Sequence, residues 1–494
     1  MRYFLRESPE KHGINSVDII RFLNDVEVIK SNLHTFMLLK GGVVVAEGYR
    51  YPYEASQLRL LHSGSKTFTA TAIGIAVREK LLDLEDNVIS FFPEYDSCEM
   101  DRRFKNMTVK NLLTMSTGHS EDSISVITTK QNWVEEFIKM PLQYEPGEKF
   151  LYDSGATFML SAILTRVTGV SLEKYLKTRL FEPLGITGYE WDHKDGITTG
   201  GWGLMLKPED FAKLGVLFLG KGEFEGKRIF DPSWADMASS KQIDTSEIEV
   251  RDDWSKGYCF QMWRGSENTF RADGAFGQFC IIAPDKDIVA VITSEDGDSQ
   301  ELLSLFYSKV LSKAKDKMVF PDCSKQIELS RMLCNMSKPI VFDATSSYLE
   351  ERLSGRKYLV GFDGMELEIS FDFHNDRAQI AIGEKQVIDS SKVTFISGVM
   401  QCEIAPATFI EFFDNLNRSW RYSAHHSWVN YNTLLIDVYY TETAHSHQIE
   451  VIFDEDSIDM RIITSIRKYL EVNGITSARP IAYKDIRLHG SVVQ

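Results

Sequence analysis

The first 315 or so residues alternate between strand-like and helix-like patterns. Apolar residues at 36–40 and 43–47 flank the pair Gly41-Gly42, which predicts a β-hairpin with a glycine turn. The stretch 67–82 is apolar on most sides and therefore predicts a buried helix. Shorter amphipathic patterns predict further helices at 109–115, 158–167 and 208–219.

A second hairpin closes this part of the chain. Two apolar runs, 279–283 and 288–293, are separated by the turn-forming residues 284–287, and a last helix starts at Gln300. Strands at both ends with helices between them predict one sheet assembled from both ends. The expected fold is therefore α/β in the α+β sense, an antiparallel sheet flanked by helices with a helical insertion.

The pattern changes from Phe320 onward. Pro321 and Pro339 mark a connector, and short stretches of alternating polarity follow it. These stretches predict an antiparallel β domain, and they lie at 367–373, 379–382, 434–440, 449–453 and 458–463. We expect a first domain at 1–318, a linker at 319–338 and a β-rich domain at 339–494.

Composition narrows the classes of function. The 494 residues include 55 Lys and Arg against 71 Asp and Glu, and a net charge of −16 disfavours nucleic acid as a partner. No apolar run reaches the ~18 residues of a membrane span, and the N-terminus lacks the apolar stretch of a secretory signal. The six cysteines form no CxxC pair, which indicates reduced thiols. We expect a cytoplasmic protein that acts on a small molecule without cofactor or metal, and its oligomeric state stays open.

The segment most informative about chemistry is Leu61-His-Ser-Gly-Ser-Lys-Thr. Ser63 and Lys66 are three residues apart at the start of the buried helix, so their side chains share one face. A lysine whose pKa is lowered by burial can take the proton of a serine nucleophile. Ser-x-x-Lys by itself is common, and the alternative is that Ser63 caps the helix while Lys66 is solvated.

Two further segments accompany this pair. Tyr152 stands directly before a helix, and a phenol beside a lysine can pass a proton to a leaving group. Residues 271–278 contain Gly274 and Gly277 at the start of a strand, where a backbone N–H could face a substrate carbonyl. No G-x-S-x-G and no G-x-x-x-x-G-K-[ST] element exists in the chain, so neither an α/β-hydrolase nor a P-loop enzyme is indicated.

With these segments in order, the chain resembles the serine β-lactamase and penicillin-binding-protein superfamily. The resemblance is to class C β-lactamases, family VIII carboxylesterases and 6-aminohexanoate-dimer hydrolases, and it extends from about residue 8 to 313. Its landmarks are 61–69, 111–118, 150–155, 167–169, 200–208 and 274–278.

The resemblance implies a role for each matching residue. Ser63 would be the acylated nucleophile, Lys66 its base and Tyr152 the tyrosine of the Tyr-x-Asn element, with the backbone N–H groups of Ser63 and Ala275 as the oxyanion hole. The positions expected to contact substrate are Ser154, Ala272, Gly274, Phe276 and Trp202.

Two positions depart from the family pattern. Ser154 stands where these β-lactamases carry Asn, and Ala272-Asp273-Gly274 stands where they carry Lys-Thr-Gly. The lysine that recognises a substrate carboxylate is therefore missing, and Asp273 would disfavour anionic substrates. By strand alternation, Arg271 and Asp273 should face away from Ala272. We expect cleavage of an ester or small amide, with weak or no β-lactamase activity.

Alternatives stay open at this point. A non-catalytic descendant that only binds a peptidoglycan-like or small acyl ligand would also resemble the family. We interpret His62 and His119 as structural, and the pairs His425-His426 and His445/His447 lack an acidic partner at metal-ligand spacing. The β-rich extension either shapes the mouth of the active site or stabilises the fold or an oligomer.

Overall fold

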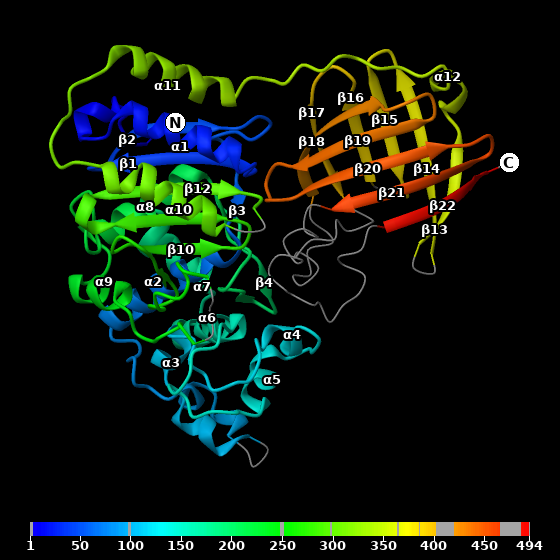
Figure 1. Cartoon of the computed structure of the whole chain (residues 1–494). Coiled ribbons are helices and arrows are strands. Elements are labelled where there is room, and N and C mark those ends of the chain that lie inside the picture. The colour runs from blue at the N-terminus through cyan, green and yellow to red at the C-terminus, as the bar shows by residue number, and fades with distance from the viewer. Residues whose placement is uncertain are drawn as a thin grey trace. The chain divides into compact units, whose positions relative to one another are not determined.

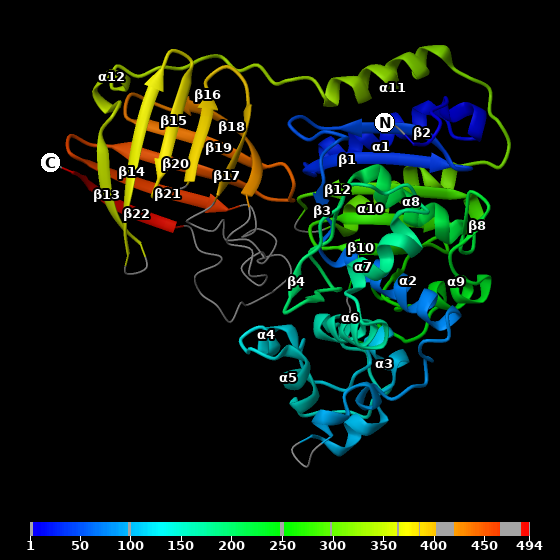
Figure 2. The same cartoon turned by 180° about the vertical axis from the view of Figure 1, so that it is seen from behind.

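The structure is a computed structural model that describes residues 3–96, 100–247, 251–296, 299–362, 365–384, 386–401, 419–464 and 486–493. The chain divides into two units (Figures 1 and 2). The helix–sheet unit comprises Met1–Gly48, Leu60–Ser294 and Ser299–Leu333. The β unit comprises Tyr49–Arg59, Glu295–Asp298 and Cys334–Gln494.

The helix–sheet unit is built on a six-stranded antiparallel sheet. Its order is β2-β1-β12-β11-β10-β9, so the first hairpin pairs with strands that come some 250 residues later. The strands are β1 (Leu33–Lys40), β2 (Val43–Tyr49), β9 (Trp263–Arg264), β10 (Phe270–Gly274), β11 (Gln278–Ala283) and β12 (Ile288–Ser294). Every residue of β1, β11 and β12 is buried, because helices cover both faces of the sheet. Both predicted hairpins are confirmed.

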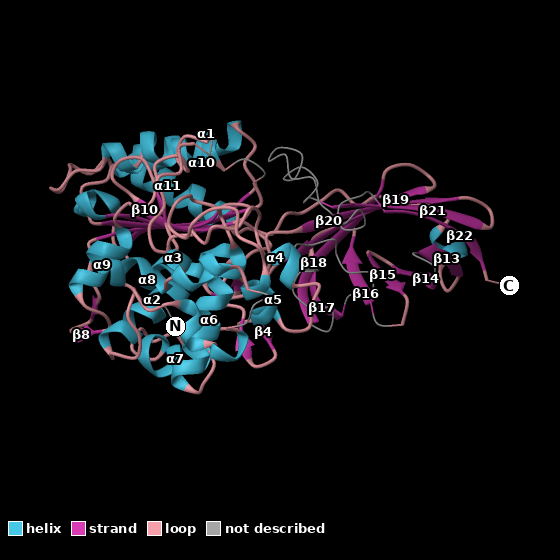
Figure 3. Ribbon diagram, turned by 90° about the horizontal axis from the view of Figure 1, so that it is seen from below, coloured by secondary structure: helices cyan, strands magenta, loops and turns pink. Residues whose placement is uncertain are grey.

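Two helical layers enclose this sheet. Figure 3 shows the strands between a layer with α1 (Ser16–Val28) and α10 (Gln300–Lys309) and a layer with α2 (Ser65–Arg78), α8 (Pro208–Leu219) and α9 (Pro232–Ser239). Twelve of the fourteen residues of α2 are buried, as its apolar pattern predicts.

The helical insertion lies between α2 and the later strands. Its helices are α3 (Val109–Leu113), α4 (Ile124–Ile127), α5 (Trp133–Lys139), α6 (Ser154–Thr168), α7 (Leu172–Leu176) and the π-helical turn η6 (Lys177–Phe181).

Short 3-10 turns occur along the whole helix–sheet unit. They are η1 (Pro9–His12), η2 (His62–Gly64), η3 (Val88–Phe91), η4 (Pro93–Tyr95), η5 (Arg102–Asn106), η7 (Pro284–Lys286) and η8 (Leu311–Lys313). Short strand pairs join β3 (Arg59–Leu60) to β6 (Met205–Leu206), β4 (His193–Lys194) to β5 (Ile197–Thr198) and β7 (Glu223–Phe224) to β8 (Lys227–Arg228).

The β unit is a ten-stranded sheet in the part of the chain that the structure describes. Its order is β16-β15-β14-β13-β22-β21-β20-β19-β18-β17, and a further pairing of β16 with β18 closes it on itself. The strands are β13 (Lys357–Phe362), β14 (Met365–His374), β15 (Arg377–Ile382), β16 (Gln386–Ser391), β17 (Ile396–Gln401), β18 (Ser419–Trp428), β19 (Thr433–Tyr440), β20 (Ser446–Phe453), β21 (Ser457–Thr464) and β22 (Ile486–Val492). The predicted antiparallel β domain is therefore present.

Two segments that come before the C-terminal strands in the sequence, Tyr49–Arg59 and Glu295–Asp298, belong to this β unit. The Arg59 guanidinium is buried 4.3 Å from the centre of the Tyr53 ring and donates to the carbonyl oxygen of Thr441. The Glu295 carboxylate accepts two hydrogen bonds of 3.1 Å from the backbone N–H and the hydroxyl of Ser446. The segment that follows β2 and the segment that follows β12 in the six-stranded sheet thus form part of the β unit.

The segment expected as a plain connector contains helix α11 (Cys323–Met336), and a short helix α12 (Glu350–Leu353) precedes β13. Near its start, α11 is held by a 2.7 Å hydrogen bond from the Gln326 amide to the carboxylate of Glu10 in η1. Only Leu329 of α11 is buried, so the polar composition that suggested a linker belongs to a surface helix.

Among the described residues, no single helix is both long and apolar enough to cross a membrane. The consecutive helical segments Ser154–Thr168 and Leu172–Phe181 meet that criterion only when they are taken together, and they are bent by 70°.

Candidate active site

Ser63 and Lys66 are in direct contact at the start of α2. Ser63 lies in η2, Lys66 is the second residue of α2, and the Lys66 Nζ lies 2.9 Å from the Ser63 Oγ. The Ser65 hydroxyl braces this turn by donating to the His62 carbonyl at 2.6 Å. The predicted shared face of Ser63 and Lys66 is therefore present, and Lys66 is buried rather than solvated.

The Lys66 ammonium is surrounded by oxygen acceptors. It donates to the Gly201 carbonyl at 2.9 Å and lies 3.3 Å from the Ser154 Oγ. Desolvation by burial lowers the pKa of Lys66 to about 8, against the raising effects of Asp122, Asp153 and Asp273. A large fraction of the lysine side chains is therefore neutral at mildly alkaline pH, which is the state that can accept a proton.

Tyr152 lies beside the same ammonium. The Lys66 Nζ is 4.9 Å from the centre of the Tyr152 ring. The ring of Tyr152 stacks on Trp263, with ring centres 5.8 Å apart and planes inclined by 16°. Folding thus brings a hydroxyl, an amine and a phenol, which are up to 89 positions apart in the chain, into one cluster.

The start of α6 carries a buried aspartate that the sequence analysis did not single out. Asp153 is the N-cap of α6, where its Oδ1 accepts from Gly155 N at 3.0 Å and from the Ser123 hydroxyl at 2.6 Å. Its Oδ2 lies 3.2 Å from the Nδ1 of the buried His119. An Asp directly before a helix is a recognisable capping signal, but nothing in the sequence indicates its contact with His119.

A second carboxylate close to Lys66 was also missed. The Asp122 Oδ1 accepts from Ser154 N at 2.9 Å and from Ile124 N at 3.1 Å. Burial and the charge of Asp153 raise the pKa of Asp122 to about 7. Asp122 lies in a loop without periodicity, so only the tertiary fold identifies it.

Strand β10 approaches the nucleophile through Gly274. A Cβ atom at Gly274 would lie only 2.1 Å from the carbonyl oxygen of Leu61, two residues before Ser63. A glycine is therefore required here for the backbone of β10 to lie against the turn that carries Ser63. Ala275, whose backbone N–H is expected in the oxyanion hole, directly follows Gly274 in the sequence, and Phe276 comes next.

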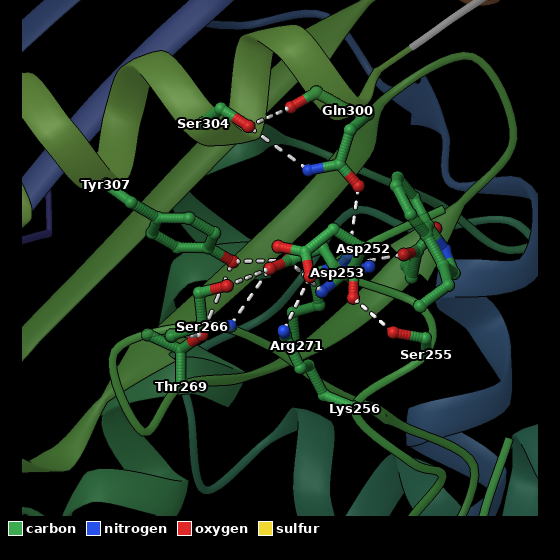
Figure 4. A network of polar contacts seen from close by, with 12 residues as sticks. Asp252, Asp253, Ser255, Lys256, Ser266, Thr269, Arg271, Gln300, Ser304 and Tyr307 are labelled. Atoms are coloured by element: carbon green, nitrogen blue, oxygen red, sulfur yellow. Dashed lines mark hydrogen bonds and ion pairs between the residues drawn. The ribbon is translucent and has the colours of Figure 1, made fainter. Parts of the chain in front are cut away.

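A buried ion-pair network holds the other face of β10 (Figure 4). The Arg271 guanidinium donates to Asp253 at 2.7 Å, and none of the Arg271 side chain is exposed. It also donates to Asp273 at 2.8 Å. Asp253 also accepts from the Tyr307 hydroxyl at 2.9 Å and from the Ser266 hydroxyl at 2.8 Å. Arg271 and Asp273 are thus joined on one face of the strand, as alternation predicts. Ala272, which lies between them in the sequence, is fully buried.

The aromatic residues expected near the site are buried. Phe276 packs against the His62 imidazole with ring centres 5.3 Å apart, and Trp202 lies 6.1 Å from Trp133. Trp202 follows Gly201, whose carbonyl receives the Lys66 hydrogen bond.

Four histidines of the C-terminal region, namely His425, His426, His445 and His447, are buried in the β unit. Desolvation by burial lowers the pKa of His426, His445 and His447 to about 3, and that of His425 in the same direction. Among the residues that the structure describes, no three His, Cys, Asp or Glu side chains are grouped closely enough to hold a metal ion.

Comparisons with known proteins agree on one family. The Beta-lactamase family model matches residues 35–308, which is more than half of the 494 residues. The lovastatin esterase of Penicillium rubens is 27% identical over 206 residues, 37% of this chain and 51% of the esterase. The 6-aminohexanoate-dimer hydrolase of Paenarthrobacter ureafaciens is 26% identical over 282 residues, 52% of this chain and 71% of that enzyme.

One solved structure shows the shared fold. A candidate 6-aminohexanoate-dimer hydrolase from Bacillus anthracis superposes with a TM-score of 0.51 at 21% identity, covering 63% of this chain and 86% of that one. The chain spans about half the length of the fungal esterase and a larger share of the two bacterial proteins.

Proposed function

The chain belongs to the beta-lactamase family, and from this membership we propose that it is a serine hydrolase that works through an acyl-enzyme on Ser63. The observation that carries the proposal is the 2.9 Å contact between the Ser63 hydroxyl and the buried Lys66 amine. A serine hydroxyl needs an adjacent base to become nucleophilic, and a lysine with a pKa of about 8 supplies one near neutral pH.

The chemistry then follows in two steps. Ser63 Oγ attacks the substrate carbonyl carbon while its proton passes to neutral Lys66, and the developing oxyanion is held by the backbone N–H groups of Ser63 and Ala275. Tyr152, beside Lys66, passes this proton to the leaving alcohol or amine as the scissile bond breaks. A water molecule then attacks the acyl ester, and the acid product leaves with Ser63 restored.

The substrate class follows from the residues that replace the family's carboxylate-binding lysine. Ala272 offers no charge, and Asp273 is an acidic group already paired with Arg271. We therefore propose a carboxylic ester, a small amide or a D-amino-acid peptide bond without an obligatory carboxylate, with weak or no β-lactamase activity. The names of the relatives, an esterase and an amide hydrolase, support the same range. Ser154, Gly274, Phe276 and Trp202 would line this substrate together with Ala272.

The direct test is covalent labelling of Ser63. We expect a fluorophosphonate to add one adduct to the intact protein, located at Ser63 by peptide mapping, and p-nitrophenyl butyrate to be hydrolysed. Ser63→Ala should abolish both signals, and Ser65→Ala, which alters the neighbouring hydroxyl, should retain the label. Wild-type protein that takes no label and hydrolyses no ester, D-amino-acid anilide or nitrocefin would refute the enzyme and favour a binding protein.

The pH profile is a second test. Because Lys66 must be neutral to accept the proton, kcat/KM should rise with pH and level off above about 8. A profile that is flat between pH 6 and 9 would exclude Lys66 as the base.

A further inference from the structure

Asp122 connects two helix starts beside the Ser63–Lys66 pair. It lies in the loop between α3 and α4, and its Oδ1 accepts the N–H of Ile124, the first residue of α4, at 3.1 Å. The same oxygen accepts the N–H of Ser154, the first residue of α6, at 2.9 Å. One carboxylate oxygen therefore fixes the position of Ser154 relative to the loop.

Ser154 in turn contacts the lysine. Its hydroxyl lies 3.3 Å from the Lys66 Nζ, which is 2.9 Å from the Ser63 Oγ. Asp122 is thus linked to the hydroxyl of Ser63 through the backbone and side chain of Ser154 and the amine of Lys66. Because serine is shorter than the asparagine expected at this position, its contact with Lys66 depends closely on where the backbone of Ser154 is held.

Three carboxylates affect the charge of Lys66, and they come from different elements. Asp122 is in the α3–α4 loop, Asp153 caps α6 and Asp273 is in β10. The aromatic ring of Tyr152 completes the surroundings of the ammonium.

Two of these carboxylates are engaged by other side chains. Asp153 accepts from the Ser123 hydroxyl and lies against His119, and Asp273 is paired with Arg271 at 2.8 Å. In the part of the chain that the structure describes, the Asp122 carboxylate has no ion-pair partner within 4.0 Å, and the two hydrogen bonds that it accepts come from backbone N–H groups to one oxygen. The positive charge of Lys66 lowers the pKa of Asp122, against the larger raising effects of burial and of Asp153.

We propose that Asp122 is a positioning residue for the acylation step, which holds Ser154 against Lys66 and opposes the loss of the lysine's proton that burial favours. This role rests on the proposed function of Ser63 and Lys66. A negative charge near an amine stabilises the ammonium form. The charge of Asp122 therefore raises the pH at which Lys66 becomes neutral and able to accept the serine proton.

The charge is tested without turnover, by NMR titration of Lys66 in protein labelled with ¹³C at the lysine ε-carbons, with Lys66→Arg to assign the signal. In Asp122→Asn the amide oxygen can still accept from Ser154, but the charge is gone. We expect the Lys66 midpoint to fall by about one pH unit. Asp210→Asn is the matched control, because Asp210 is a buried carboxylate 2.7 Å from Lys213 in α8, and it should leave the Lys66 midpoint unchanged.

The positioning is tested by the rate of phosphonate labelling at Ser63. In Asp122→Asn the acid limb of the rate should move to lower pH with the Lys66 midpoint, while the plateau changes little. Asp122→Ala removes the acceptor as well, so its plateau should fall about tenfold or more, and Ser154→Ala should show a comparable loss. Asp122→Ser, whose hydroxyl can still accept a hydrogen bond, replaces the Asn variant if the latter does not fold.

The two proposals fail in different ways. A Lys66 midpoint that is equal in wild type and Asp122→Asn, or a plateau unchanged in Asp122→Ala, would overturn the role of Asp122 even if Ser63 is labelled. Absence of labelling in the wild type would refute the proposed function, whereas the lysine titration would still report whether Asp122 controls the charge of Lys66.

Discussion

In the helix–sheet unit a fully buried arginine is retained as a cation between two carboxylates, whereas in the β unit two buried histidines are kept neutral. Arg271 lies between Asp253 and Asp273 with no exposed side-chain surface. His426 and His447 are instead paired with hydroxyl groups, at 2.8 Å from Ser390 and 3.2 Å from Tyr440. A buried pair retains its charge because the opposite charge compensates for desolvation, while a histidine without such a partner gives up its proton.

This difference places charge where the proposed chemistry needs it. The Arg271 network fixes β10, which reaches the Ser63 turn through Gly274, and Lys66 is surrounded by three carboxylates. In the β unit, His426 and His447 form hydrogen bonds with hydroxyl groups instead, and the interior is mainly aromatic and aliphatic. The two units should therefore respond differently to substitution and to acid.

The largest expected effect is the loss of the buried ion pair. Arg271→Met leaves Asp253 and Asp273 buried without their cation, which should lower the free energy of unfolding of the helix–sheet unit by about 3–5 kcal/mol. The matched control is Arg228→Met, because Arg228 forms a 2.6 Å pair with Glu223 at the surface, and it should cost less than about 1 kcal/mol. Hydrogen exchange of peptides from β10 and β11, measured as a function of urea concentration, gives the free energy of unfolding of both variants. Equal losses of stability in Arg271→Met and Arg228→Met would show that burial does not make the Arg271 pair more important.

Acid should act on the β unit first. The pKa of His426 and His447 is about 3 in the folded protein and about 6.5 in an unfolded chain, so the unfolded state binds more protons below pH 6.5. The stability that these groups contribute is present above about pH 6.5 and is lost as the pH falls. Between pH 7 and pH 5 we expect about 2 kcal/mol for each histidine.

The measurement is hydrogen exchange of β18–β20, corrected for the intrinsic pH dependence of exchange and compared with β11 and β12. His447→Leu should remove about a third of the acid sensitivity of these strands, because the pKa of His426 and His445 is lowered to a similar extent. If β11 and β12 lose stability at pH 5 as much as β18–β20, the histidines do not explain the response.

A smaller effect concerns how closely each unit is packed around its glycines. Gly274→Ala forces a backbone shift because its Cβ would lie 2.1 Å from the Leu61 carbonyl oxygen, and we expect kcat/KM for ester hydrolysis to fall at least about tenfold. Gly361→Ala in β13 of the β unit meets no atom within 4 Å, so stability and activity should change little. Ester kinetics and thermal unfolding of the two variants distinguish a local effect at the site from a general effect of the substitution.

The smallest effect should come from restoring the family's lysine. Ala272→Lys places a cation where the resemblance expects one, and it should lower KM for carboxylate-bearing β-lactams a few-fold by attracting the carboxylate. Esters without a carboxylate serve as the control substrate and should show unchanged KM. Unchanged β-lactam kinetics in a folded variant would contradict the interpretation that Ala272 stands where the family carries its carboxylate-binding lysine.

Much of the fold could be predicted because its signals are local. Apolar runs around Gly41-Gly42 and 284–287 predict the two hairpins, and the all-apolar stretch after Ser65 predicts the buried helix α2. Alternation predicts the strands of the β unit. Helix α11 was missed because a surface helix with one buried side chain has little periodicity to distinguish it from a linker.

The sequence by itself determined which residues are available for chemistry: Ser63 and Lys66 at one helical turn, Tyr152 before α6, and an alanine in place of the family's carboxylate-binding lysine. These features depend on residue type and short spacing. Tertiary structure alone decided that Asp122, Asp153 and Asp273 converge on Lys66, and that Tyr49–Arg59 joins the β unit. The reason is physical, since desolvation and electrostatic interaction depend on distances in space, and residues far apart in the chain acquire those distances only when the core is packed.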